Sequence, residues 1–258
     1  MQKRKRFAAC LAAALFVIFL TACRLMETGP ASQPAAAFNP SSSAAQPAPQ
    51  QPVKNPPAAF ALDVPYLSQE GLLPTGCELI SAKMLLQYWG RDVPIERLVE
   101  ALPTGSLRQG ADGALYGPSP DDVFVGDPTS PSGYGCFPPV IERLLQQFLG
   151  DAYTVRDTTG ASLSELCSTY VVRGEPVLVW ATMNMVEMEP GTQWVLDGSG
   201  EMFTWPSHEH CLVLTGYTED AYLLNDPYEN NGKIAVPKAL LEQRYAELSC
   251  RSVAVVQA

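Results

Sequence analysis

Basic side chains are scarce in this sequence of 258 residues. It contains 17 lysines and arginines against 27 aspartates and glutamates, which gives a formal net charge of −10 at pH 7. Phosphate binding needs clustered Lys and Arg side chains, so this balance argues against a nucleic-acid partner. Hydrophobic residues make up 47% of the chain, which is enough to form the core of one or two domains.

Cys-x-x-Cys pairs are absent although the chain has seven cysteines, and only two histidines are present. This absence argues against a zinc ribbon and against a thioredoxin-type redox motif. We therefore expect no cofactor and no metal ion. One zinc alternative stays open, with Cys77, His208, His210 and Cys211 as ligands. Strand alternation weighs against it, because Cys211 would point away from His210.

Long hydrophobic runs are also missing, since residues 7–20 form the longest one and a membrane-spanning helix needs ~20 apolar residues. Residues 3–6 read Lys-Arg-Lys-Arg, and the run ends in Leu-Thr-Ala followed by Cys23. This order is typical of a signal peptide, and its end resembles a bacterial lipobox. We predict that residues 1–22 are removed and that a lipid on Cys23 anchors the protein to the outer face of the cytoplasmic membrane. An uncleaved anchor helix is the alternative.

Residues 23–59 are rich in Pro, Ala, Ser and Gln. Such a stretch cannot bury enough apolar surface to become ordered, so we expect a semi-extended tether. The folded domain would then be residues 60–258. No internal repeat is visible. Outside the cell, disulfides could form, and both disulfides and free buried thiols remain open for Cys136, Cys167, Cys211 and Cys250.

Apolar spacing in the folded domain predicts helices first and strands afterwards. The expected helices are residues 77–89, 94–102, 138–149 and 163–172. The expected strands are residues 177–182, 193–196, 210–216, 221–225, 233–236 and 252–256. This order indicates an α+β fold in which N-terminal helices pack on a C-terminal antiparallel sheet. Residues 103–135, rich in Gly, Pro, Ser and Asp, are expected to form a long surface excursion.

Cys77 is the candidate nucleophile, because it lies at the start of the first expected helix. Thr75 and Glu78 fit a capping box, Thr-x-x-Glu, which would place the thiol in the first helical turn. Unpaired N–H groups and the positive end of the helix dipole lie there. They lower the pKa of a thiol and so favour the nucleophilic thiolate.

His210 opens an apolar strand and is the candidate general base, whereas His208 falls in a loop. If residues 210–216 and 221–225 form a hairpin, Asp226 returns beside His210 and can orient its ring, with Asn225 as the second choice. Gln69 could supply an oxyanion donor, together with the backbone N–H of Cys77. The aromatic side chains expected nearby could line a cleft or belong to the core, and these are Tyr134, Phe137 and Trp205.

These motifs resemble the bacterial cysteine peptidases that process double-glycine leaders, and more closely a group of stand-alone secreted relatives. The matching segments are Val64 to Gly71, Pro74 to Leu79, His210 to Tyr217 and Asn225-Asp226-Pro227. The resemblance covers about residues 62–257. It implies a papain-like fold, with Cys77 as nucleophile, His210 as base, Asp226 as orienting residue and Gln69 as oxyanion donor.

The resemblance implies a monomeric thiol hydrolase that cleaves a peptide or protein substrate outside the cell. No transporter domain is present, so coupling to export of a leader peptide is not implied. Acyl transfer to an amine by the same residues is one alternative. A binding module that keeps the fold but has no turnover is another.

Overall fold

The computed structural model describes residues 50–258. The predicted signal peptide, the predicted lipidation site Cys23 and the predicted tether up to residue 49 lie outside the described residues. Within the described part, no helix is long and apolar enough to cross a membrane.

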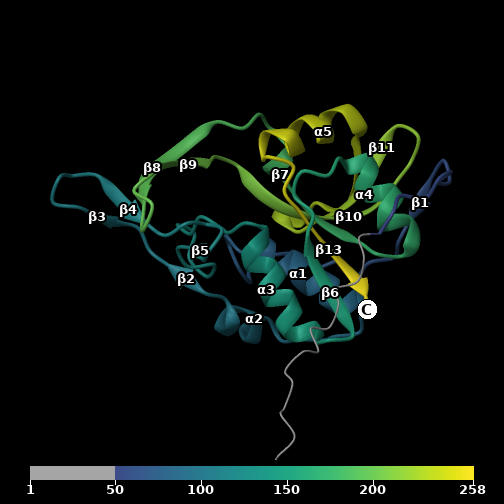
Figure 1. The fold of residues 1–258 in the computed structure, drawn as a ribbon, viewed down its shortest axis with the longest axis horizontal. Coiled ribbons are helices and arrows are strands. Elements are labelled where there is room, and N and C mark those ends of the chain that lie inside the picture. The colour runs from purple at the N-terminus through teal and green to yellow at the C-terminus, as the bar shows by residue number, and fades with distance from the viewer. Residues whose placement is uncertain (1–49) are drawn as a thin grey trace, which may run out of the picture. The chain divides into compact units, whose positions relative to one another are not determined.

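A seven-stranded antiparallel sheet forms the centre of the domain (Figure 1). Its strands follow the order β12-β11-β10-β7-β13-β6, and β1 pairs with β10 outside this path. Their bounds are β1 Phe60–Ala61, β6 Tyr153–Asp157, β7 Val177–Thr182, β10 Glu209–Tyr217, β11 Ala221–Asp226, β12 Gly232–Pro237 and β13 Ser252–Gln257. The two central strands, β7 and β10, are buried along their whole length.

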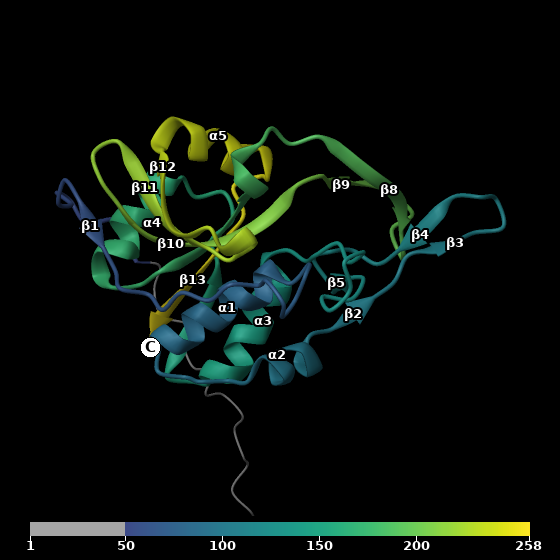
Figure 2. The same cartoon turned by 180° about the vertical axis from the view of Figure 1, so that it is seen from behind.

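Helices cover both faces of this sheet (Figures 1 and 2). On one face lie α1 (Cys77–Tyr88), α2 (Ile95–Ala101) and α3 (Pro138–Leu149); on the other lie α4 (Leu163–Thr169) and α5 (Lys238–Glu247). A hydrophobic core lies on each face of the sheet, and side chains that alternate along β7 contribute to both. Leu178 and Trp180 pack with α1 and α3, whereas Val177 and Val179 pack with α4 and α5. This period of two is what a strand buried on both faces requires.

The predicted α+β order is therefore present. The long helices α1 and α3 and the strands β7, β10, β11, β12 and β13 lie where the apolar spacing placed them. The helix predicted over residues 163–172 is present as α4 followed by the 3-10 turn Val171–Arg173. Strand β6, helix α5 and the 3-10 turns Met183–Met185 and Tyr228–Asn230 were not predicted.

The predicted surface excursion, residues 103–135, is partly wrong. It contains β2 (Thr104–Gly105), β3 (Arg108–Gln109), β4 (Leu115–Gly117) and β5 (Phe124–Val125). Strands β3 and β4 join β8 (Pro190–Leu196) and β9 (Met202–Pro206) in a small second sheet that projects from the main body (Figures 1 and 2). The side chains of Phe124 and Val125 are fully buried and belong to the same core cluster as residues of α1 and α3.

Residues 50–57 belong to the segment expected to be a tether, and hydrogen bonds attach them to the domain. The N–H of Val53 donates to the carbonyl of Ser168, and the hydroxyl of Tyr217 donates to the carbonyl of Pro57. The cysteines at positions 77, 136, 167, 211 and 250 are free thiols, so no disulfide links the described part of the chain.

Candidate active site

Cys77 is the first residue of α1, and Gly76 is the N-cap residue. A Cβ at Gly76 would lie 2.7 Å from the Cβ of Leu73, so only glycine fits the turn that presents the cysteine. The predicted capping box is wrong. The N-cap is Gly76, no side chain caps the helix, and the hydroxyl of Thr75 donates to the carbonyls of Asp127 and Ser130, at 3.3 and 2.9 Å.

Glu78 points into the protein interior instead of back toward the helix start. Its side chain is fully buried. One carboxylate oxygen, Oε1, accepts the N–H of Cys136 at 2.7 Å, and the other, Oε2, accepts the thiol hydrogen of Cys77 at 3.3 Å. In this structure the sulfur of Cys77 is therefore held by its own neighbour.

His210 and Asp226 form a buried pair across the hairpin of β10 and β11. The register Val213↔Asn225 brings the ends of the two strands together, and the ring Nε2 lies 2.7 Å from Asp226 Oδ1. Both side chains are 1% exposed. The second nitrogen of the ring, Nδ1, is then the one left for a proton of the nucleophile. Asn225, the second choice, donates instead to the carbonyls of Val64 and Pro65.

The carboxylate of Asp226 is stabilised in its ionised form. Burial alone would raise its pKa, but the hydrogen bond to His210 and the charge of that ring outweigh burial and lower the pKa. Two further donors contribute, the N–H of Tyr228 at 3.0 Å and the amide of Asn231 at 2.9 Å. An orienting carboxylate needs this combination, since it must stay charged while it holds the ring.

Gln69 is 3% exposed and lies beside the turn that follows Asp226. Its backbone N–H donates to the carbonyl of Pro227 at 2.9 Å. Its side-chain Nε2 donates to the carbonyl of Pro74 at 3.1 Å, and its Oε1 is buried without a hydrogen-bond partner. The amide group is thus fixed next to the residues that lead into Cys77.

A cavity of about 320 Å³ brings the predicted residues together. It is lined by Gln69, Pro74, Thr75, Cys77, Pro131, Gly133, Tyr134, Met183, Trp205, His208, Glu209, His210 and Tyr228. Asp226 lies behind His210. Of the aromatic residues left open by the sequence, Tyr134 and Trp205 line the cavity, whereas Phe137 is fully buried and stacks on Trp205 with ring centroids 5.5 Å apart.

The expected lowering of the thiol pKa is not what the structure shows. Burial, followed by the nearby charges of Glu78 and Glu209, raises the pKa of Cys77 well above its usual value. Burial also raises the pKa of Glu78 to about 7 and that of Glu209 well above its usual range. In the state seen here, the neutral thiol of Cys77 is favoured, because burial, reinforced by two acidic groups, disfavours the thiolate.

Sequence reasoning missed Glu209, although a signal for it was present. It precedes His210 and is two residues from Cys211, so alternation places Glu209 and Cys211 on the same face of β10. Cys211 belongs to the same core cluster as residues of α1, which identifies that face as the one against α1, and Ser81 of α1 donates to the carbonyl of Cys211 at 2.9 Å. The dipeptides Cys77-Glu78 and Glu209-His210 therefore meet across the helix–sheet interface.

The sequence of the chain is similar to sequences of known proteins. The model of the Peptidase_C39-like family matches residues 61–253. The uncharacterized protein YvpB of Bacillus subtilis strain 168 is 30% identical over 180 residues, which are 70% of this chain and 68% of that protein.

Solved structures are similar as well. A crystal structure described as a C39-like peptidase from Bacillus anthracis is 27% identical with a TM-score of 0.67 and covers 78% of this chain and 98% of its own. A double-glycine-motif protease of a transporter is 14% identical with a TM-score of 0.44, and the match covers 80% of this chain and 96% of that chain. This likeness is too low to support an argument. The predicted α+β, papain-like fold is confirmed, and family and fold support a cysteine peptidase-like function.

Proposed function

Because the chain belongs to the Peptidase_C39-like family, we propose that it is a cysteine peptidase that cleaves a peptide or amide bond through Cys77, His210, Asp226 and Gln69. The observation that carries the proposal is the buried His210–Asp226 pair, 2.7 Å apart, beside a cavity that Cys77 and Gln69 also line. The basic start, the short apolar run and Cys23 in the sequence support a lipid-anchored protein outside the cytoplasmic membrane.

The reaction begins when the thiol of Cys77 turns from Glu78 toward His210. Nδ1 of His210 takes the thiol proton, and the sulfur attacks the carbonyl carbon of the substrate. Asp226 holds Nε2 and stabilises the imidazolium that forms. The negative charge on the carbonyl oxygen is stabilised by the amide of Gln69 and by the N–H of Cys77, which has no partner within the helix.

The second half of the reaction regenerates the thiol. His210 gives its proton to the leaving amine, so the carbon–nitrogen bond breaks and a thioester with Cys77 remains. Water then loses a proton to Nδ1 of His210 and attacks the thioester. The carbon–sulfur bond breaks, the carboxylic acid product leaves, and His210 returns its proton to the sulfur of Cys77.

The proposal is tested with the full chain, its C77A variant and a C250A control. Cys250 is a partly exposed thiol outside the cavity. We expect a peptide library to be cleaved by the parent protein and by C250A but not by C77A. We also expect an epoxide probe to label Cys77, as mapped by mass spectrometry. Cleavage that persists in C77A would contradict the mechanism.

Two other outcomes separate the alternatives. Transfer of the acyl group to an added amine, in preference to water, would identify an acyltransferase that uses the same residues. Peptide binding without turnover, equal in the parent and in C77A, would identify a binding module.

A further inference from the structure

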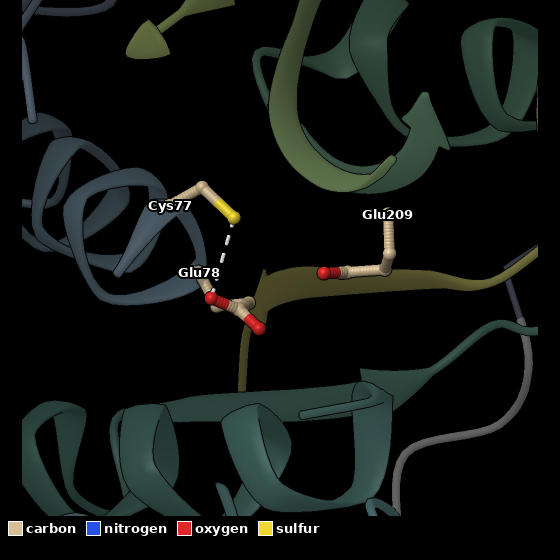
Figure 3. A group of neighbouring side chains, drawn as sticks. All are labelled: Cys77, Glu78 and Glu209. Atoms are coloured by element: carbon tan, nitrogen blue, oxygen red, sulfur yellow. Dashed lines mark hydrogen bonds between the residues drawn. The ribbon is translucent and has the colours of Figure 1, made fainter. Parts of the chain in front are cut away.

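Three buried side chains meet beside the cavity, which two of them line, and the mechanism uses only one of the three. They are Cys77 and Glu78 at the start of α1 and Glu209 at the start of β10. Their sulfur and one oxygen from each carboxylate all lie within 4.8 Å of one another. Figure 3 shows the carboxylate of Glu209 directed toward that of Glu78, with the sulfur of Cys77 above them.

Glu209 is buried and incompletely bonded. It is 6% exposed, and its Oε1 has no hydrogen-bond partner. Among the described residues, no salt bridge involves Glu78 or Glu209. A buried carboxylate oxygen without a partner costs free energy, so this arrangement has capacity for a further positively charged or donor group.

Gly135 gives the two carboxylates the room to converge. A Cβ at this position would lie 2.5 Å from Oε1 of Glu78 and 2.9 Å from Oε2 of Glu209. Both acidic groups therefore pack against one bare stretch of backbone. Any other residue at position 135 would push them apart.

We propose that Cys77, Glu78 and Glu209 form a binding site for a divalent cation of the zinc class, and that the bound ion blocks the nucleophile. A thiolate ligand selects zinc-like ions over magnesium and calcium, which prefer all-oxygen sites. The sulfur binds as a thiolate, so its proton is released to solvent when the ion enters. Three protein ligands leave the fourth tetrahedral position open to the cavity.

The observed spacing fits such an ion after a small movement. Zinc bonds of about 2.3 Å to sulfur and about 2.0–2.2 Å to oxygen place tetrahedral ligand atoms about 3.5 Å apart. Sγ of Cys77 and Oε2 of Glu78 are already 3.3 Å apart, so mainly Glu209 must approach. His210 is not part of this group, whose ligand atoms come from Cys77, Glu78 and Glu209 alone. The site thus differs from the zinc alternative considered from the sequence.

Binding is measured on the reduced, EDTA-treated full chain titrated with Co²⁺, which reports a thiolate ligand by a charge-transfer absorption band. We expect one equivalent to produce the band, Zn²⁺ to abolish it and Mg²⁺ to have no effect. C77A should lack the band. E78Q and E209Q should each weaken Co²⁺ binding by more than about 10-fold, because each removes a direct ligand and loss of even an outer-shell partner costs about that much. E175Q, another buried carboxylate, and C250A should bind like the parent.

The blocking of the nucleophile rests on the proposed function, whereas binding of the ion does not. Zn²⁺ should protect Cys77 from alkylation in the parent, and EDTA should restore the reaction. A thiolate absorption band in a protein without peptidase activity would support the metal site and contradict the proposed peptidase function. No band in the parent, or the same band in C77A, would overturn the metal site. Circular dichroism of each variant separates loss of binding from loss of folding.

Discussion

The N–H of Gln69 donates a 2.9 Å hydrogen bond to the carbonyl of Pro227, the residue directly after Asp226. The link is strengthened nearby, since the N–H of Glu229 donates to the carboxylate of Glu70 at 3.1 Å. The proposed oxyanion donor and the residue that orients His210 therefore lie on two segments that are tied to each other.

Asp226→Asn is expected to lower kcat/KM about 10³- to 10⁴-fold, because an amide cannot stabilise the imidazolium and favours the wrong tautomer of His210. KM should change little. The measurement is steady-state hydrolysis of a peptide identified in the library. The matched control is D63N, which removes an exposed partner of Lys233; a similar loss in D63N would show that the effect is not specific to the pair.

Acid should remove the stabilising contribution of Asp226. The folded protein holds the pKa of this carboxyl below 3.8 through its partners, whereas in the unfolded chain it keeps its ordinary value. The contribution is therefore present above that value and is lost as the pH falls through the folded-state pKa. Denaturant midpoints of the parent and of D226N should differ at pH 7 and converge below about pH 4. A constant difference over this range would contradict the linkage.

Gln69→Ala is expected to lower kcat by about 10²- to 10³-fold if its amide stabilises the oxyanion. The corresponding effect on KM should be small, because the interaction strengthens in the transition state. A rise in KM with unchanged kcat would assign Gln69 to substrate binding instead. Q146A is a suitable control, since Gln146 bonds to the backbone of Tyr153 and Val155 at a distance from the cavity.

Ser81→Ala should loosen the contact between α1 and β10. The buried hydroxyl of Ser81 donates to the carbonyl of Cys211 at 2.9 Å, and its removal costs about 1 kcal/mol in the free energy of unfolding. Denaturation in urea measures this directly. S164A alters a serine outside this contact on α4 and should have no such effect; equal destabilisation in both variants would contradict the assigned role.

The elements that carry the chemistry could be predicted because their sequence signals are local. Periodicity located α1 behind Cys77, and the short turn between β10 and β11 fixed the hairpin that returns Asp226 to His210. The predicted roles of these residues stay predictions until the variants are measured. The register of β10 and β11 places Asp226 behind His210, and His210 lines one cavity with Cys77 of α1.

Other features depend on contacts that no local pattern reveals. The Thr75–Glu78 capping box was a reasonable local expectation, but the hydroxyl of Thr75 donates to carbonyls of the loop at residues 127–130. The thiol pKa likewise depends on burial and on the nearby Glu78 and Glu209, and Glu209, 132 positions away in the sequence, approaches only after α1 packs on β10. The second sheet was missed because it joins two short segments from different halves of the chain.

That second sheet has a consequence for the order of events during synthesis. Tyr116 of β4 pairs with Val195 of β8 in parallel, and such distant pairings form slowly. These two strands can pair only after residue 195 has been synthesised, and His210 follows Cys77 by 133 positions. The cysteine is therefore without its proposed base until most of the chain has been made.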